Sequence, residues 1–116
     1  MCSSDLSMTP SEFLARADAV LRTLEDAVGN IGDNGDIDIE ASRAGNVVTI
    51  EFEDGSKIIV NSQEPMQEMW VAARAGGFHF RWDGTRWIDT KNGAELFDAL
   101  SRYASQQAGA ALVLRA

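Results

Sequence analysis

The sequence predicts an α+β domain, a two-layer α/β sandwich in which an N-terminal and a C-terminal helix pack on one face of a roughly six-stranded antiparallel sheet. Apolar residues recur every three or four positions near each end of the 116-residue chain, and apolar and polar residues alternate between these segments. Gly-containing turns separate the alternating stretches. A chain of this length suits one domain, which we expect over residues 9–116 after a flexible tail at residues 1–8.

The first helix is expected to begin near residue 10. Thr9 can cap it, Pro10 suits the first helical position and Glu12 can complete a capping box. An apolar stripe follows at three- and four-residue steps: Phe13, Leu14, Ala17, Val20, Leu21, Leu24 and Val28. Gly29 and Asn30 predict the end of this helix.

Alternation predicts the strands. Residues 36–41 alternate strictly, which places their isoleucines inward and their acids outward. The further strands are expected at residues 47–52, 57–61, 70–73, 78–82 and 85–89. Asp54-Gly55 and Asp83-Gly84 are typical hairpin turns, and Gly76-Gly77 separates two further strands. The six strands should therefore form an antiparallel meander.

A second helix is expected over residues 94–107, with Gly109 as its stop. Its apolar face comprises Leu96, Phe97, Leu100, Tyr103 and Ala104. Residues 112–114 are expected to fold back against the helices. Two amphipathic helices that bracket a meander most simply share one face of the sheet, and the other face then remains in water.

The charge is unevenly distributed. The formal net charge is −8, and residues 1–54 hold twelve acidic and three basic residues whereas residues 55–116 hold six and seven. Nucleic acids and anionic membranes attract Lys and Arg, so this balance argues against both as partners. The single cysteine, Cys2, suits a reducing compartment, and no signal-peptide or membrane-spanning pattern is present. We therefore expect a bacterial cytoplasmic protein with cationic partners.

The acidic residues of the first half form two expected rows, one along a helix flank and one along a strand, and the rows are expected to join if that strand is an edge strand beside the helix. The candidate cation ligands are Asp18, Glu25, Asp26, Asp33, Asp36, Asp38 and Glu40. Carboxylate-only sites suit magnesium, calcium, manganese and ferrous iron, and this chemistry does not choose among them. The alternative is a solvated face that aids solubility and protects an edge strand from pairing. Both interpretations remain open on the residues alone.

Catalytic motifs do not appear in the sequence. His79 is the only histidine, and no nucleophile elbow, HExxH, CxxC or Gly-rich phosphate loop accompanies it. We therefore expect a binding or regulatory protein without enzymatic activity.

A second candidate surface surrounds Trp70. If Val71 is buried under the helices, Trp70 faces the open side of the sheet, where an uncovered indole often marks a contact surface. Asn61, Gln63 and His79 could supply a polar rim and are predicted to bind a partner there. The alternative is an indole that only covers part of the sheet.

Several segments together resemble the frataxin family, in particular its bacterial members. The resemblance covers about residues 11–108. It rests on DID at 36–38, FEDGSKIIV at 52–60, NSQEP at 61–65 followed by Trp70, GGFHF at 76–80, WI at 87–88 and GAELFDAL at 93–100. It implies the same two-helix sandwich on an antiparallel sheet.

The resemblance also implies a function. Frataxins bind ferrous or ferric iron weakly at an acidic ridge, with other divalent cations possible in vitro, and they assist iron-sulfur cluster assembly by contacting a cysteine desulfurase and a scaffold protein. The ridge carried over by position comprises Asp18, Glu25, Asp26, Asp36, Asp38 and Glu40. The scaffold-facing residues would be Asn61, Gln63 and Trp70. The resemblance further implies a protein that is monomeric without iron.

Some positions depart from the family pattern. Gly29, Asn30, Gly32 and Asn34 stand where bacterial relatives often carry further acids. Leu14 replaces a metal-binding histidine. Glu68 stands where glutamine is common and places a charge at the expected scaffold-facing surface. An alternative function, proposed for some frataxins, is an iron-oxidising, iron-storing oligomer of ferroxidase type. No Glu-x-x-His pair of a di-iron centre is present to support it.

Overall fold

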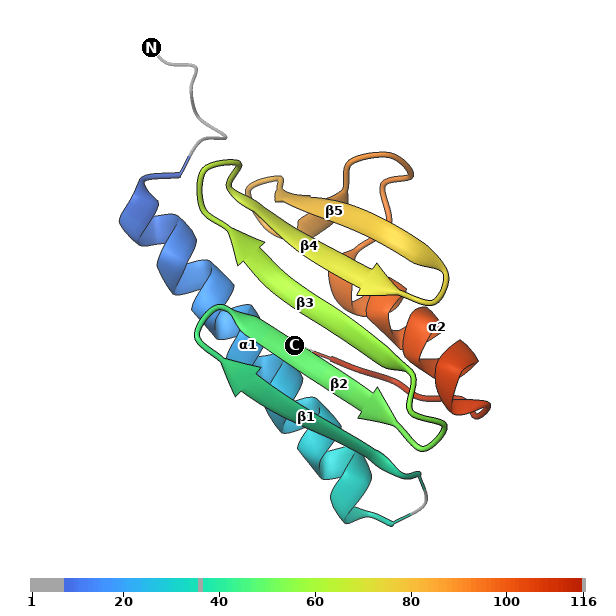
Figure 1. Cartoon of the computed structure of the whole chain (residues 1–116). Helices are drawn as coiled ribbons and strands as arrows, with labels where there is room; N and C mark the ends of the chain where they lie inside the picture. The colour runs from blue at the N-terminus through green and yellow to red at the C-terminus, as the bar shows by residue number, and fades with distance from the viewer. Residues whose placement is uncertain (1–7, 36, 116) are drawn as a thin grey trace.

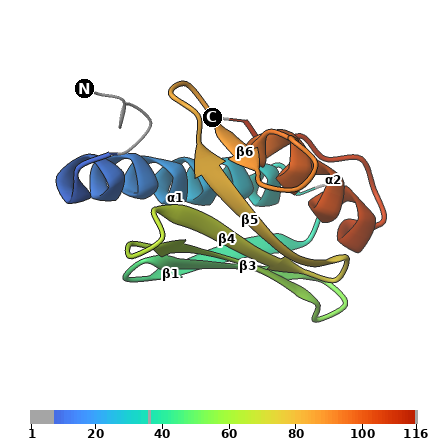
Figure 2. The same cartoon turned by 90° about the horizontal axis from the view of Figure 1, so that it is seen from above.

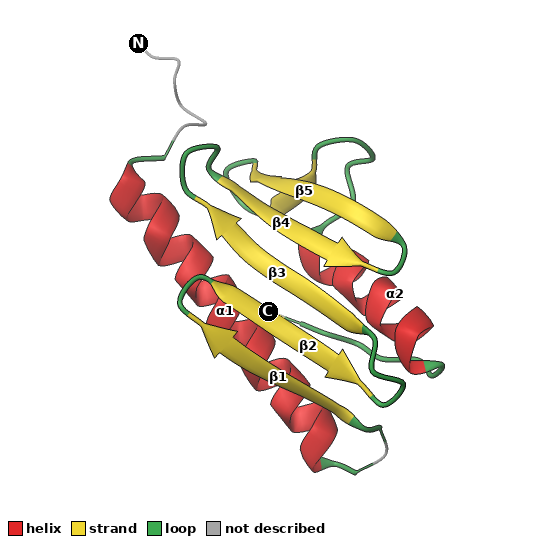
Figure 3. Cartoon of the chain, viewed as in Figure 1, coloured by secondary structure: helices red, strands yellow, loops and turns green. Residues whose placement is uncertain are grey.

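The computed structural model describes residues 8–35 and 37–115. Two helices and six strands follow one another along the chain (Figure 1). The elements are α1 (Pro10–Asp33), β1 (Ile39–Ala44), β2 (Val47–Phe52), β3 (Lys57–Gln63), β4 (Glu68–Ala73), β5 (Gly76–Trp82), β6 (Trp87–Asp89) and α2 (Leu96–Ala108). This confirms the predicted fold class and the predicted order of elements (Figure 3).

The N-terminus of α1 forms as the sequence predicts. Thr9 Oγ1 accepts a 3.1 Å hydrogen bond from the backbone N–H of Glu12, and Glu12 Oε1 accepts a 2.9 Å bond from the N–H of Thr9. This reciprocal capping box satisfies two backbone donors that the first helical turn leaves without partners. Met8, which we assigned to the tail, is only 9% exposed and exchanges hydrogen bonds with the side chain of Gln67.

Two sequence predictions about α1 are wrong. Leu14 is 48% exposed at the edge of the apolar stripe, whereas its neighbour Phe13 is fully buried and packs edge-to-face on Trp87 of β6. The helix also continues past Gly29 to Asp33. Its last turn packs Ile31 against the core, and this tertiary contact outweighs the weak helix propensity of Gly29 and Asn30.

Gly32 brings the last turn of α1 close to the sheet. A Cβ atom at this position would lie 2.7 Å from the backbone carbonyl oxygen of Ile39. The absence of a side chain therefore allows the helix to approach the start of β1.

The sheet is antiparallel, with the strand order β1-β2-β3-β4-β5-β6. Hairpins at Gly45-Asn46 and at Asp54-Gly55 connect the first three strands, as predicted. In the second of these turns Gly55 has φ of +85°, a conformation that glycine adopts at little cost. The meander therefore confirms the predicted topology (Figure 1).

Strand boundaries differ from the predicted ones. β1 spans Ile39–Ala44 rather than residues 36–41, because its ladder with β2 runs from the Ile39–Phe52 pair to the Ala44–Val47 pair. β6 begins at Trp87 because Asp83 Oδ1 accepts hydrogen bonds from the backbone N–H groups of Thr85 and Arg86 and holds both in the turn. β5 already begins at Gly76, so the preceding turn lies at residues 74–75.

Both helices lie on one face of the sheet (Figure 2). The buried stripe of α1 packs there on alternate strand residues, which include Val48, Ile50, Ile58, Val60, Met69, Val71 and Phe80. The residues between them in each strand point to the opposite, open face. This confirms the expectation that Val71 is buried and Trp70 lies on the open side.

α2 ends at Ala108, and the following Gly109 adopts a left-handed conformation with φ of +70°. The chain then turns back along α2, and Leu112 and Leu114 become buried, as predicted for this segment. The backbone N–H of Leu114 donates to Ser101 Oγ, and that of Leu112 donates to Ser105 Oγ, each at 2.8 Å. Two serines on one face of α2 therefore accept the backbone hydrogen bonds of the C-terminal segment, as a neighbouring strand would in a sheet.

Neither described helix is both long enough and apolar enough to cross a membrane.

Candidate functional site

Asp18 joins α1 to the edge strand β1. Its Oδ1 lies 2.6 Å from Nη2 of Arg43, and its Oδ2 lies 3.2 Å from Nε of Arg22. The hydrogen bond from Arg43 lowers the pKa of Asp18, and the positive charges of Arg43 and Arg22 act in the same direction. The negative charge of Asp18 is therefore already balanced by two arginines.

Glu25, Asp26 and Asp33 carry acidic charge further along α1. Glu25 lies seven residues after Asp18 and therefore shares its flank of the helix, where it is half-buried. Asp26 is exposed and lines a groove with Thr23 and Asn30 of the same helix. Asp33 is the exposed last residue of the helix. These three carboxylates form no ion pair within the described part of the chain.

The expected acidic row on the strand is only partly realised. Asp36 lies outside the described residues, and Asp38 precedes β1 as an exposed residue that lines a groove with Glu53 and Asp54. Glu40 lies within β1, between Ile39 and Ala41, which face the core. Glu40 therefore points to the open face of the sheet, away from α1, and pairs in register with Glu51.

The two acidic rows consequently do not merge into one compact centre. Among residues 8–35 and 37–115, no three His, Cys, Asp or Glu side chains lie close enough together to hold one metal ion. What the described chain presents is a set of separate carboxylates along α1 and beside β1, which we call the acidic surface. It comprises Asp18, Glu25, Asp26, Asp33, Asp38 and Glu40.

The second surface lies on the open face of the sheet, across β3, β4 and β5. Register places Trp70 between Asn61 on one side and His79 on the other. The Trp70 and His79 rings stack with centroids 4.5 Å apart and an angle of 8° between their planes. Trp70 and Asn61 are half-buried, whereas His79 is exposed. We call these three residues the aromatic row.

A neighbouring row of polar residues supports Trp70. Gln63, Glu68 and Arg81 pair in register across the same three strands. Glu68 is only 4% exposed, although it lies on the open face. Its Oε1 accepts a 2.9 Å hydrogen bond from the indole nitrogen of Trp70, and its Oε2 accepts a 2.7 Å bond from Nη2 of Arg81.

Sequence reasoning brought Asn61, Gln63, Trp70 and His79 to one face, and the register agrees with that placement. It treated Glu68 as a charge on the surface, whereas the structure buries this carboxylate and pairs it with Arg81. Arg81 was missed altogether. Its position two residues after His79 in β5 was an available signal, since strand residues two apart share a face.

A family model described as a frataxin-like domain matches residues 6–110 of the chain. The chain belongs to the frataxin family. Within it, the chain is of the bacterial CyaY type, because it is 65% identical over 105 residues to a Cupriavidus taiwanensis protein named iron-sulfur cluster assembly protein CyaY. That match covers 90% of this chain and 95% of the relative. A protein of the same name from Ralstonia nicotianae is 64% identical over 100 residues, covering 86% of this chain and 88% of the relative.

Solved frataxins share this fold. Frataxin from Psychromonas ingrahamii superimposes with a TM-score of 0.83 at 28% identity, covering 94% of this chain and all of that one. A trimeric frataxin from Saccharomyces cerevisiae, solved in complex with ferrous iron, has a TM-score of 0.69 at 21% identity, covering 89% of this chain and 88% of that one. At that identity the yeast protein supports the fold of this frataxin and nothing about its ligands.

Proposed function

We propose that this frataxin assists or regulates iron-sulfur cluster assembly, that its acidic surface binds iron weakly, and that the same surface docks on a cysteine desulfurase. The observation that carries the assembly role is the 65% identity, over 90% of the chain, to a protein named for that role. We place this activity in the bacterial cytoplasm, and cell fractionation tests that placement.

The chemistry of the acidic surface supports iron as the ligand. Carboxylate oxygens are hard ligands that suit ferrous and ferric iron, and other divalent cations can compete for them. Because the described carboxylates are exposed or half-buried and are spread along α1 and β1, each ion would keep several water ligands, and binding would be weak. The proposed ligands are Glu25, Asp26, Asp33, Asp36, Asp38 and Glu40, with Asp18 as a contributor that must compete with two arginines.

Charge also supports a basic partner surface. The acidic excess lies in the first half of the chain, so a desulfurase with a basic patch would be steered toward this face. Iron and desulfurase would then compete for the same carboxylates. The aromatic row, together with Gln63, is the proposed contact for the scaffold protein, because half-buried aromatic side chains with polar neighbours are typical of interface centres.

The test compares two double variants that remove the same number of charges. Asp38→Asn/Glu40→Gln changes the acidic surface, whereas Glu64→Gln/Asp98→Asn changes two exposed acids elsewhere. Ferrous iron under anaerobic conditions and purified desulfurase are each titrated into both variants by calorimetry. We expect the Asp38/Glu40 variant to bind ferrous iron and desulfurase more weakly than the wild type does. The Glu64/Asp98 variant should match the wild type. Equal binding by the two variants would show that the acidic surface is not the site.

The scaffold contact is tested separately. Trp70→Ala should weaken binding of the scaffold protein and leave iron binding unchanged, while Val113→Ala changes an apolar side chain that is 60% exposed outside the sheet. Equal scaffold affinity of the two variants would contradict the proposal. Oxygen consumption and light scattering during the iron titration test the alternative of an iron-oxidising oligomer. The proposal predicts no oxidation faster than in buffer alone and a monomer before iron is added.

A further inference from the structure

His79 is the only histidine of the chain, and it belongs to the aromatic row on the open face of the sheet. Its ring stacks on the Trp70 indole with centroids 4.5 Å apart, and its side chain is 50% exposed. Histidine is the one side chain whose charge ordinarily changes between about pH 5 and 8. In this protein the side chain that changes charge in that range therefore lies directly on Trp70.

The carboxylate of Glu68 links the imidazole to the indole. Nδ1 of His79 lies 3.6 Å from Oε1 of Glu68, the same oxygen that accepts the 2.9 Å hydrogen bond from the indole nitrogen of Trp70. A separation of 3.6 Å is too long for a hydrogen bond to the neutral ring, whereas a protonated ring is attracted to the carboxylate across it. Protonation of His79 therefore brings a second donor to the oxygen that holds Trp70.

In the described part of the chain, the charged groups that face His79 come in opposite pairs. Arg81, on the same strand, binds the second oxygen of Glu68 at 2.7 Å, so this acid and this base balance each other. Asp89 and Lys91, at and after the end of β6, line a hollow with His79 and also carry opposite charges. The β3 residue in the aromatic row is uncharged. A proton on His79 therefore changes the row from neutral to positive.

We propose that protonation of His79 weakens docking of the scaffold protein on the aromatic row. This inference rests on the proposed scaffold contact and adds its regulation by pH. A partner that covers the row must remove water from the half-exposed ring, which costs far more free energy for a charged imidazole than for a neutral one. Glu68 offsets only part of that cost, because its two oxygens already bind Trp70 and Arg81. The centres of protein interfaces are depleted of charged residues for the same reason.

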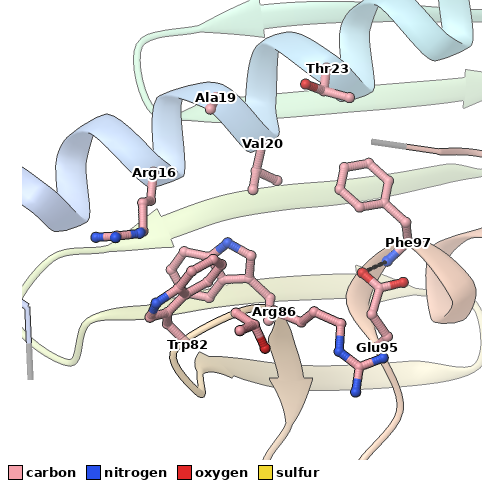
Figure 4. A pocket seen from close by; sticks show the side chains of 10 residues that line it. Arg16, Ala19, Val20, Thr23, Trp82, Arg86, Glu95 and Phe97 are labelled. Atoms are coloured by element: carbon pink, nitrogen blue, oxygen red, sulfur yellow. Dashed lines mark hydrogen bonds between the residues drawn. The ribbon is translucent and has the colours of Figure 1, made fainter. Parts of the chain in front are cut away.

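The coupling between the two rings is measured first on the free protein. The ring signals of His79 and the indole N–H signals of the tryptophans are followed by NMR from pH 5 to pH 7.5. The indole N–H signal of Trp70 should shift together with the His79 signals. Trp82 packs against the core on the other face of the sheet, at a pocket that Arg16 and Val20 of α1 also line (Figure 4). Its indole signal is therefore the internal control and should stay constant.

Two substitutions should move the midpoint of the His79 titration in opposite directions. Glu68→Gln leaves the positive charge of Arg81 beside the ring, so protonation of His79 should require a lower pH. Arg81→Gln leaves the carboxylate of Glu68 without its cation, so His79 should take up its proton at a higher pH. Each midpoint should move by about 0.2–0.7 pH units, the size expected for a partly exposed charge pair. Arg102→Gln, at an exposed position of α2, is the control and should leave the midpoint unchanged.

Docking is then measured by calorimetry with purified scaffold protein at pH 7.5 and pH 5.5. His79→Phe keeps an aromatic ring that never carries a charge, and His79→Arg keeps a planar group that always does. The affinity of the wild type relative to His79→Phe should fall about fivefold from pH 7.5 to pH 5.5. The affinity of His79→Arg relative to His79→Phe should be low at both pH values. Titration of groups on the scaffold protein itself cancels in these ratios.

The amide spectrum of each variant reports its fold, so affinities are compared only on folded protein. The proposal is overturned if the indole signal of Trp70 does not follow the titration of His79. It is also overturned if the affinity of the wild type relative to His79→Phe stays constant or rises as the pH falls. Equal binding of the scaffold protein by Trp70→Ala and the wild type would instead contradict the proposed scaffold contact. The NMR titration of the free protein would then still decide whether His79 is coupled to Trp70.

Discussion

The indole nitrogen of Trp70 is hydrogen-bonded to Oε1 of Glu68, two residues earlier on the same strand, at 2.9 Å. Arg81 binds the other oxygen of that carboxylate, and His79 stacks on the indole ring. A buried acid and an exposed histidine thus fix the plane of Trp70 from two directions. A partner that contacts this indole would find it already ordered and would not lose side-chain entropy by ordering it.

Arg81→Gln should destabilise the protein more than Glu68→Gln does. The Glu68 side chain is 5% exposed and the Arg81 side chain 62% exposed. Loss of Arg81 leaves a buried carboxylate without its cationic partner, at a cost of about 2–3 kcal/mol. Loss of the Glu68 charge leaves an arginine that water can solvate, so we expect the free energy of unfolding to fall by only about 1 kcal/mol. Urea denaturation of both variants at pH 7 gives the two free energies of unfolding.

Glu64→Gln, at an exposed turn residue, controls for the loss of one carboxylate and should lie within about 0.5 kcal/mol of the wild type. The reverse order, with Glu68→Gln the more costly change, would mean that the bond to Trp70 contributes more than the ion pair does.

Asp18→Asn should remove part of the pH dependence of stability on the acid side. Hydrogen bonding to Arg43 lowers the pKa of folded Asp18 below its ordinary value of 3.8. A lowered folded pKa contributes stability that is present above pH 3.8 and is lost as the pH falls through the folded value. The melting temperature of the wild type should therefore exceed that of the variant at pH 6, and the difference should shrink toward pH 3.

Asp26→Asn removes one negative charge from the same helix without breaking an ion pair of the described residues, and serves as the matched control. Because Asp18 and Arg22 are substantially exposed, the effect of Asp18→Asn should also decrease in 1 M salt. A difference between wild type and the Asp18 variant that is constant from pH 6 to pH 3 would contradict the role assigned to this carboxylate.

The serines of α2 should protect the amides of the C-terminal segment one by one. Ser101→Ala removes the acceptor of the Leu114 N–H, and Ser105→Ala removes that of the Leu112 N–H. Each loss should cost about 1 kcal/mol and speed hydrogen exchange mainly at its own amide. Hydrogen exchange at the Leu112 and Leu114 amides, followed by NMR in both variants, tests whether each serine protects only its own amide. Equal acceleration of both amides in both variants would show that the segment detaches as one unit.

Alanine substitutions in α1 should have opposite effects at two glycines. Gly29→Ala meets no atom within 4 Å and should stabilise the helix by about 0.5–1 kcal/mol. Gly32→Ala places a Cβ atom 2.7 Å from the Ile39 carbonyl oxygen and should destabilise the protein by about 1–3 kcal/mol. Thermal unfolding of the two variants side by side checks the sign of each change. Stabilisation by both would show that α1 can shift away from β1.

Most of the fold was predictable because its determinants are local. The capping box at Thr9 and Glu12, the period of the apolar residues and the turn at Asp54-Gly55 can each be recognised within a few residues. Boundaries set by tertiary contacts were missed. The end of α1 depends on the packing of Ile31 against the core, and the start of β1 depends on the pairing of Ile39 with Phe52.

The two surfaces were predictable to different degrees. Alternation within strands was sufficient to place Trp70 and His79 on the open face. It could not reveal that Glu68 is buried, because that burial depends on the cross-strand neighbour Arg81. Likewise, acids counted along the sequence suggested that the two rows would join, whereas register turns Glu40 away from α1.

The contact of Gly32 with the start of β1 also limits how much negative charge this corner of the protein can carry. Residues 29, 30 and 34, at the end of α1 and just after it, are exposed and have room for carboxylates. Position 32 has none, and position 35 has φ of +79°, which disfavours any residue with a side chain. Engineering a stronger cation site here would therefore have to add acids at positions 29, 30 and 34. The backbone geometry at positions 32 and 35 favours glycine and leaves no place for an acidic side chain.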